Sequence, residues 1–99
     1  MAKRLTSIFT DNMNKCIFTG SSKVERHHVF GSFNKARSEK YGFIVPLRPD
    51  YHPNGVFATD HAKNEVDPWL KAECQKYYEE HIGSREEFMA EFGRNYIMD

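Results

Sequence analysis

Hydrophobic and polar positions in the first half of the chain alternate with turn residues in a way that is typical of short strands. Three apolar segments predict strands at residues 15–18, 24–30 and 43–47. The last strand ends before Pro49, because proline lacks the N–H that a sheet ladder needs. Between the second and third strands, Asn34 can cap a short helix that runs through Tyr41 and stops at Gly42. A further helical turn is predicted to begin at Asp60.

Apolar residues in the last third recur at the three- and four-residue intervals of an amphipathic helix. One helix is predicted from the cap Asp67 to the stop Gly83, with a face that comprises Leu70, Cys74, Tyr77 and His81. Ser84 and Glu87 have the spacing of a capping box, which opens a second helix that ends before Gly93. Short strands followed by a helical pair predict the α+β class.

Length and composition indicate one globular domain. The 99 residues, of which 39% are hydrophobic, can bury one modest core but not two. No apolar run approaches the roughly 18 residues that cross a bilayer. The N-terminus lacks the apolar stretch of a signal peptide, so we expect a soluble, cytoplasmic protein without a membrane partner. Cys16 and Cys74 form no CxxC pair, which favours reduced thiols over a disulfide framework.

The net charge is zero, but charge is unevenly distributed along the chain. Residues 1–48 carry nine Lys and Arg against three acidic residues, a net charge of +6. Residues 49–99 carry five basic against eleven acidic residues, a net charge of −6. A phosphate backbone would be attracted to the first half and repelled by the second. The alternative is that the basic residues merely keep the surface soluble.

Four histidines lie within thirty-five residues of one another: His27, His28, His52 and His61. Neutral imidazoles can bind a divalent ion that neutralises the charge of a phosphodiester, while a further histidine takes a proton from the attacking water. These residues are the minimum that a metal-assisted phosphodiesterase needs. Adjacent residues on a strand point to opposite faces, so His27 and His28 can serve one site only if the strand ends or bulges there. The alternative is that one packs inward and the other faces solvent.

Five motifs occur in a fixed order along nearly the whole chain. They are Glu-x-His-His-Val-Phe-Gly at residues 25–31, Ser-Glu-Lys-Tyr-Gly at residues 38–42, an apolar strand ending in Val-Pro-Leu at residues 45–47, His52, and Phe-Gly-Arg-Asn-Tyr at residues 92–96. With them the chain resembles the HNH, or ββα-metal finger, endonucleases, and more narrowly the small HNH-type proteins of phages and prophages. The resemblance implies one domain over residues 1–99, with a small ββα-metal core at about 15–66 and a C-terminal helical pair at about 67–93.

The resemblance also implies roles for individual residues. His28 becomes the general base, and the cofactor becomes one divalent ion (Mg, Mn, Ni or Zn) held by His27, His52 and His61. A general base contributes roughly 10² to 10⁴ in rate, so loss of His28 should cripple catalysis without unfolding the protein. Arg37 and Lys40 become candidate phosphate contacts, although isolated basic residues can also be merely solvated.

Two departures from the family pattern concern zinc and asparagine. Many HNH proteins hold a structural zinc with two CxxC pairs, and the corresponding positions here are Cys16, Thr19, Arg48 and Tyr51. One thiol cannot form a tetrahedral thiolate site, so we infer that the structural zinc is absent and that packing of Phe18, Phe43 and Tyr51 replaces it. Phe43 also stands where the family often has an asparagine, for which Asn34 or Asn54 can substitute.

These features predict a metal-dependent endonuclease or nickase that hydrolyses double-stranded or branched DNA, in phage recombination or DNA processing inside a bacterial host cell. A second possibility is a catalytically degenerate HNH-fold module that binds DNA or a protein partner, and a third is a structural domain whose histidines satisfy core hydrogen bonds. In the enzyme, DNA should approach Arg37 and Lys40 while the acidic C-terminal helices face away. Lys71 and Lys76 should therefore contribute little to DNA binding.

Overall fold

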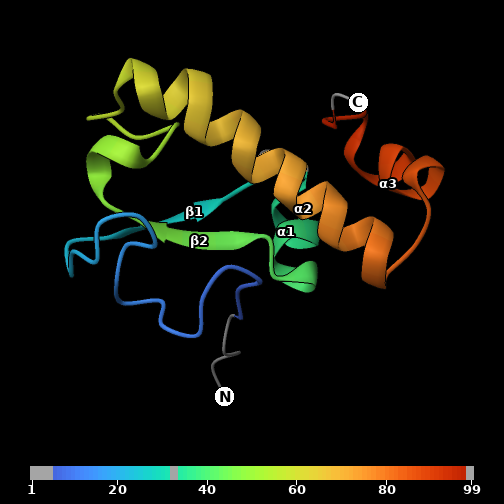
Figure 1. Ribbon diagram of the computed structural model, residues 1–99, viewed down its shortest axis with the longest axis horizontal. Helices are drawn as coiled ribbons and strands as arrows, with labels where there is room; N and C mark the ends of the chain where they lie inside the picture. The colour runs from blue at the N-terminus through green and yellow to red at the C-terminus, as the bar shows by residue number, and fades with distance from the viewer. Residues whose placement is uncertain (1–5, 32–33, 98–99) are drawn as a thin grey trace.

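Within residues 6–31 and 34–97, which the computed structural model describes, the fold joins a two-stranded antiparallel sheet to three α-helices (Figure 1). In chain order the elements are β1 (Glu25–His28), α1 (Lys35–Tyr41), β2 (Ile44–Leu47), the 3-10 helix η2 (Pro49–Tyr51), the π-helical segment η3 (Ala62–Val66), α2 (Asp67–His81) and α3 (Arg85–Phe92). The α+β class is confirmed, and two strands followed by a long helix are compatible with a ββα layout. No helix of the described part is long and apolar enough to cross a membrane.

β2 is buried along its whole length because it lies between β1 and the N-terminal segment. On one edge, β1 pairs with it in an antiparallel register. On the other edge, Ser7 Oγ donates to Ile44 O over 2.5 Å and Ile17 N donates to Pro46 O over 3.3 Å. Pro46 costs no hydrogen bond to β1, because its nitrogen faces the same outer edge as its carbonyl.

The strand predicted at residues 15–18 is wrong, because this segment is a turn. Cys16 N donates to Ser21 O and Gly20 N donates back to Cys16 O, each over 2.9 Å, so the chain closes on itself instead of extending. Gly20 has a φ of 74°, a left-handed conformation that glycine adopts without steric penalty. Cys16 and Cys74 are both buried, and both are free thiols.

The long helix begins earlier than predicted, and Asp67 does not cap it. Helical conformation starts at Asp60, passes through η3 and continues into α2 without a break. Thr59 stabilises this start, since its Oγ1 accepts a backbone N–H of the first turn over 3.1 Å. The π-helical turn widens the backbone just before Pro68, which has no N–H to donate inside the helix. Asp67 instead forms an ion pair with Lys71, one turn later.

Both shorter helices have the boundaries that the sequence predicts. α1 stops at Gly42, with a φ of 78°, and α3 stops at Gly93, with a φ of 93°. Both glycines have the left-handed conformation that commonly ends a helix. α3 opens with the predicted capping box, in which Ser84 Oγ accepts from Glu87 N and Glu87 Oε1 accepts from Ser84 N, each over 3.1 Å.

The core lies between the sheet and the C-terminal helices and is rich in aromatic rings. α2 buries a face made of Leu70, Cys74, Gln75 and Tyr78. This differs from the predicted face, because Tyr77 is only partly buried and His81 is exposed. Phe30, which follows β1, lies with its ring centroid 4.5 Å from that of Phe92 and 5.7 Å from that of Phe88. The end of β1 is therefore tied directly to α3.

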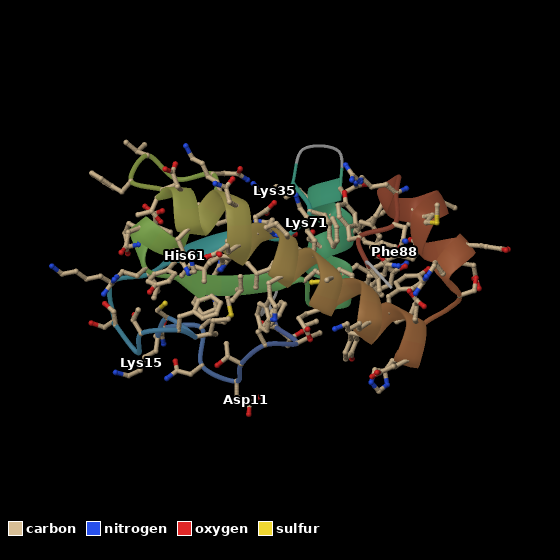
Figure 2. The ribbon with its side chains drawn as sticks, turned by 45° about the horizontal axis from the view of Figure 1, so that its top comes forward. Asp11, Lys15, Lys35, His61, Lys71 and Phe88 are labelled. Carbon is tan, nitrogen blue, oxygen red and sulfur yellow. The ribbon has the colours of Figure 1, made fainter. Side chains whose placement is uncertain are left out.

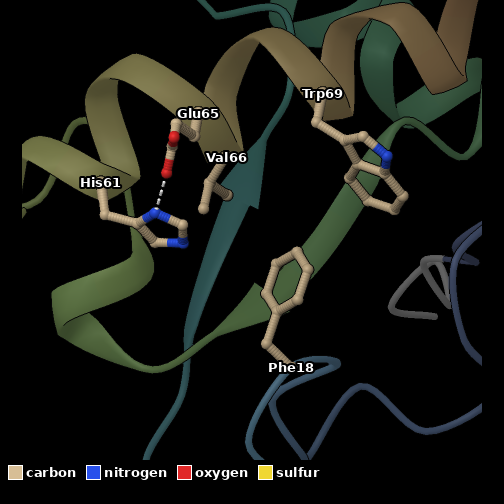
Figure 3. Close-up of a pocket in the computed structure, with 5 residues that line it drawn as sticks. All are labelled: Phe18, His61, Glu65, Val66 and Trp69. Atoms are coloured by element: carbon tan, nitrogen blue, oxygen red, sulfur yellow. Dashed lines mark hydrogen bonds and ion pairs between the residues drawn. The ribbon is translucent and has the colours of Figure 1, made fainter.

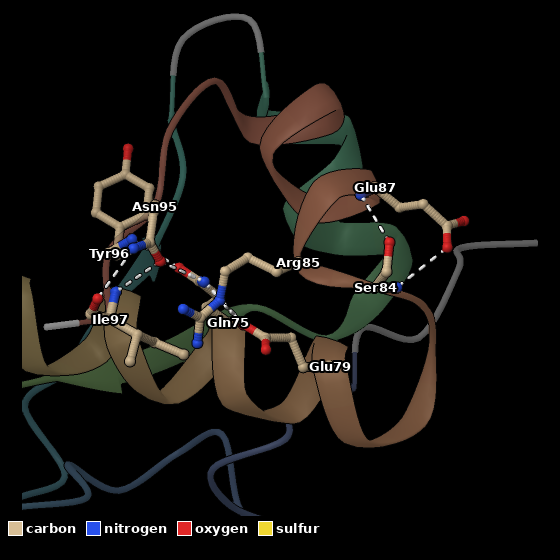
Figure 4. Close-up of polar contacts among 8 residues, drawn as sticks. All are labelled: Gln75, Glu79, Ser84, Arg85, Glu87, Asn95, Tyr96 and Ile97. Carbon is tan, nitrogen blue, oxygen red and sulfur yellow. Dashed lines mark hydrogen bonds and ion pairs between the residues drawn. The ribbon is translucent and has the colours of Figure 1, made fainter. Parts of the chain in front are cut away.

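The C-terminal tail folds back onto α2 through the buried side chain of Gln75 (Figure 4). Gln75 Nε2 donates to Asn95 Oδ1 over 2.7 Å, and Gln75 Oε1 accepts from Tyr96 N over 2.6 Å. Asn95 also closes the tail locally, since its side chain bonds both the N–H and the C=O of Ile97. Tyr96 is thereby held beside Phe30, with ring centroids 5.4 Å apart.

Candidate functional site

Two imidazoles meet beside the sheet. His27 projects from β1, and His52 follows η2, the short helix that Pro49 starts after β2. The two ring centroids lie 4.9 Å apart, with an interplanar angle of 62°. His27 is 2% exposed, and the side chain of His52 is 18% exposed. Strand pairing thus brings together two of the histidines that the sequence singled out.

His27 is neutral at physiological pH. Burial is the main cause that lowers its pKa, to about 3, and coulombic interactions of the protonated ring with His52, Lys71 and His28 lower it further. Its Nε2 is buried and has no hydrogen-bond partner among the described residues. Because nearly all buried polar atoms in proteins have a partner, an orphan imidazole nitrogen points to a ligand at this position.

His52 is oriented by a carboxylate from β1. Its Nδ1 donates to Glu25 Oε1 over 2.6 Å, which leaves Nε2 with the lone pair. Glu25 and His27 are two residues apart on one strand, so their side chains share a face of the sheet. Gly55 lets the following loop pass close, since a Cβ there would lie 3.1 Å from both Glu25 Oε1 and His52 Nδ1. The sequence analysis gave Glu25 no role, although its two-residue spacing from His27 was a usable signal.

His28 points to the other face of β1. The strand ends at this residue, and its four residue pairs with β2 follow a regular register without a bulge. Its Nε2 lies 3.0 Å from Glu39 Oε1 of α1, and its side chain is 15% exposed. His28 is therefore not mainly in solvent, and β1 ends at this residue, as the alternative of a shared site requires.

His61 is not brought to the other two predicted ligands. It lies in the first turn of the long helix, pairs through Nδ1 with Glu65 one turn later, and presents its ring edge to Tyr51 at a centroid distance of 5.9 Å. It lines a separate, aromatic pocket of about 290 Å³, shown in Figure 3 with Phe18, His61, Glu65, Val66 and Trp69. Among residues 6–31 and 34–97, no group of three or more His, Cys, Asp and Glu side chains is arranged to hold a metal ion.

The two basic residues predicted to meet DNA already have partners. Arg37 Nη1 donates to Asn34 Oδ1 over 2.9 Å, and Arg37 Nε lies 3.8 Å from Glu91 Oε1 of α3. Asn34 occupies the N-cap of α1, but its side chain does not cap the helix. Lys40 Nζ lies 5.1 Å from the ring centroid of Tyr41. An acidic residue of α3 therefore lies against Arg37, contrary to the expectation that the acidic helices face away.

A second pocket is lined by residues that follow both histidines in the chain, since Val29 comes two residues after His27 and Asn54 two residues after His52. It has a volume of about 270 Å³, and its lining includes Gly31, Asn34, Asn54, Lys71 and Tyr96. Lys71 comes from α2 (Figure 2), although the sequence predicted that this residue contributes little to DNA binding. Helical periodicity could place Lys71 on a helix, but which face of that helix meets β1 depends on tertiary packing.

Cys16, Thr19, Arg48 and Tyr51, at which the sequence predicted the loss of a zinc site, are connected by contacts beside β2. The thiol of Cys16 forms hydrogen bonds with the side chain of Thr19 and the backbone of Arg48. The guanidinium carbon of Arg48 lies 5.3 Å from the ring centroid of Tyr51. Tyr51 in turn stacks on Phe18, with centroids 5.5 Å apart. Aromatic and cation–π packing thus connects Arg48, Tyr51 and Phe18 beside Cys16.

Comparison with known proteins gives no relative for this arrangement. No protein-family model matches the chain, and neither a curated protein nor a solved structure matches it.

Proposed function

We propose that the chain is a metal-dependent endonuclease or nickase that hydrolyses phosphodiester bonds of double-stranded or branched DNA. The observation that carries the proposal is the contact between His27 and His52, of which one is neutral with an unpartnered Nε2 and the other is oriented by a carboxylate. A buried polar atom without a partner costs about 1–3 kcal/mol. A ligand at His27 Nε2 would remove that cost, and neutral imidazole is a common metal ligand.

The donors of this pair suit one divalent ion. His52 would present Nε2, because Glu25 occupies Nδ1, which is the carboxylate–histidine arrangement that orients metal-binding imidazoles. Imidazole ligands favour Ni or Zn, whereas a site that keeps several waters also admits Mn or Mg. When bound, the ion would supply Lewis-acid stabilisation of the phosphodiester charge. With His61 apart, His27 and His52 are the two protein ligands that we propose.

The resemblance to HNH endonucleases makes His28 the proposed general base, and β1 ends at His28, which is the condition under which adjacent histidines can serve one site. Because Glu39 accepts from its Nε2, Nδ1 carries the lone pair that can take a proton from water. Glu39 would also stabilise the imidazolium that forms after proton transfer, as a buried carboxylate does in other histidine-dependent hydrolases. Such a base contributes on the order of 10² to 10⁴ in rate.

The resemblance to HNH endonucleases supports this proposal from a second direction. The motif at residues 25–31 contains both His27 and His28, and the strand that ends at Leu47 leads into the loop that carries His52. Cys16 forms hydrogen bonds with Thr19 and with the backbone of Arg48. These contacts agree with a zinc knuckle in which side-chain packing has replaced the metal. The same resemblance suggests phage recombination or DNA processing in a bacterial cell as the setting.

A catalytically degenerate HNH-fold module, binding DNA or a protein partner, is the second candidate. The observation that favours it is that, within the described ranges, His61 does not complete a group of three ligands with His27 and His52. The exposed aromatic pocket between Phe18 and Trp69 also offers a contact surface.

Nicking of supercoiled plasmid separates the two candidates. Wild-type protein should nick plasmid in Mn²⁺, Ni²⁺ or Mg²⁺, and His28→Ala should lose roughly 10² to 10⁴ of that rate while keeping its melting temperature and its metal binding. His27→Leu should lose nicking and metal binding together. His81→Ala is the matched control, because the side chain of His81 is 56% exposed near the end of α2. Wild-type protein that binds metal but cuts no DNA with any of these ions would establish the binding module.

A further inference from the structure

We infer that the second pocket, lined by Gly31, Asn34, Asn54, Lys71 and Tyr96, binds a backbone phosphate of the nucleic acid, with Lys71 as its cationic contact. The inference rests on the proposed function, since it names the contact that holds the substrate beside His27 and His52. The pocket has a volume of about 270 Å³. This is just below the roughly 300–1,000 Å³ of small-molecule sites, so the pocket suits one group of a polymer rather than a whole cofactor.

Lys71 is fixed over the pocket rather than extended into solvent. Its Nζ lies 2.8 Å from Asp67 Oδ2 and 5.7 Å from the ring centroid of Tyr96, and its side chain is 26% exposed. A partly buried ammonium is screened by salt less than an exposed one. Its positive charge is one of the causes that lower the pKa of His27, so it lies within electrostatic reach of that histidine.

The other lining residues can bind an anion without adding charge. Asn34 and Asn54 each carry a side-chain NH₂ with two donors. Asn54 follows His52 by two residues, so one loop contributes both to the histidine pair and to the pocket. The oxygens of a phosphate can accept from one ammonium and two carboxamides together. Hydrogen bonds to a charged partner of this kind are shorter and roughly twice as strong as neutral ones.

The C-terminal motif helps to form this pocket. Gln75 anchors Asn95 and the backbone of Tyr96, which holds the Tyr96 ring between Phe30 and the ammonium of Lys71. The tail therefore forms one wall of the pocket, and α2 forms another. We therefore expect Lys71 to contribute to DNA binding, which is the opposite of the prediction from the sequence.

DNA affinity at several salt concentrations tests the inference without any cleavage. A fluorescent DNA duplex is titrated with full-length protein in EDTA, and anisotropy is recorded for wild type, Lys71→Gln and Lys76→Gln. Lys76 is the matched control, since it lies on the same helix with a side chain 54% exposed. Lys71→Gln should weaken binding by about tenfold and reduce the slope of log affinity against log salt by about 0.9. Asp67→Asn should tighten binding, because it removes the negative charge that now pairs with Lys71.

A second measurement, on wild-type protein and on a conservative variant, keeps the test valid if Lys71→Gln folds poorly. The side-chain NH₂ signals of Asn34 and Asn54 should shift in NMR spectra when inorganic phosphate is added to wild-type protein, and the shifts should be weaker in Lys71→Gln and restored in Lys71→Arg. Equal affinity and equal salt slope for Lys71→Gln and Lys76→Gln would overturn the inference, as would wild-type protein that binds neither duplex nor phosphate. Phosphate and duplex binding in a protein that never nicks plasmid would uphold the pocket and refute the nuclease.

Discussion

Acid should destabilise the metal-free protein through His27, and the change His27→Leu should remove that sensitivity. The pKa of His27 is lowered from 6.5 to about 3 in the folded state, first by burial and then by coulombic interactions with His52, Lys71 and His28. The unfolded chain therefore binds a proton at His27 that the folded protein does not, at any pH between these two values. Stability from this residue is complete above pH 6.5 and is lost as the pH falls toward 3.

The size of the effect follows from the two pKa values. Between pH 8 and pH 5, the proton bound only by the unfolded state should lower the free energy of unfolding by about 2 kcal/mol. No discount for solvent screening is needed, because His27 is 2% exposed. Leucine has a similar volume and no proton to bind. It also leaves no orphan nitrogen, so the variant should be at least as stable as wild type at pH 8.

Urea denaturation in EDTA at pH 8, 7, 6 and 5 measures this difference. The other titratable groups are common to both proteins, so the gap between the two stability curves should widen by about 2 kcal/mol from pH 8 to pH 5. His81→Leu, at an exposed position, should follow wild type. Parallel curves for wild type and His27→Leu would refute the reasoning, because they would show that His27 titrates normally and is not buried as a neutral imidazole.

Three further predictions concern the tail, the general base and the metal. Gln75→Leu should lower the free energy of unfolding by about 2 kcal/mol, since it removes two hydrogen bonds to the tail at about 1 kcal/mol each; an unchanged urea midpoint would show that the tail is not docked. Glu39→Gln should slow plasmid nicking at saturating DNA without weakening DNA binding, and an unchanged rate would show that Glu39 does not act through His28. Adding Mn²⁺ or Ni²⁺ should raise the melting temperature of wild type but not of His27→Leu, whereas equal shifts in both proteins would place the metal elsewhere.

Local chemistry made part of the fold predictable. The capping box of Ser84 with Glu87, and the stops at Gly42 and Gly93, depend on neighbours within four residues, and the structure has all of them. The strand predicted at residues 15–18 depended on tertiary context instead, because the turn closed by Gly20 competes with pairing to β2. Thr59 and Asp67 can each cap the start of the long helix, and the sequence alone does not say which of the two does so.

The sequence identified the histidines as a group, but it did not predict which of their side chains come together. Strand order brings His27 and His52 together, since one lies on β1 and the other follows β2. His61 was placed with them by resemblance, yet the helix that carries it starts with its Nδ1 directed at Glu65. Glu65 lies one helical turn after His61, so the two side chains can pair locally without any change in the tertiary structure. That pairing was visible in the sequence as the spacing of His61 and Glu65.

Charge along the chain was a poor guide to charge in space. The acidic C-terminal half supplies Glu91, which lies beside Arg37, and also supplies Lys71, whose charge acts on His27. A net charge summed over half of the chain hides the contribution of single residues such as these. A bound phosphate interacts mainly with the few charged side chains within a Debye length, which is about 10 Å at 0.1 M salt. How α2 packs against the sheet therefore decides which of its side chains line the second pocket, and Lys71 lies there on a helix that continues unbroken from Asp60 through the π-helical turn and Pro68.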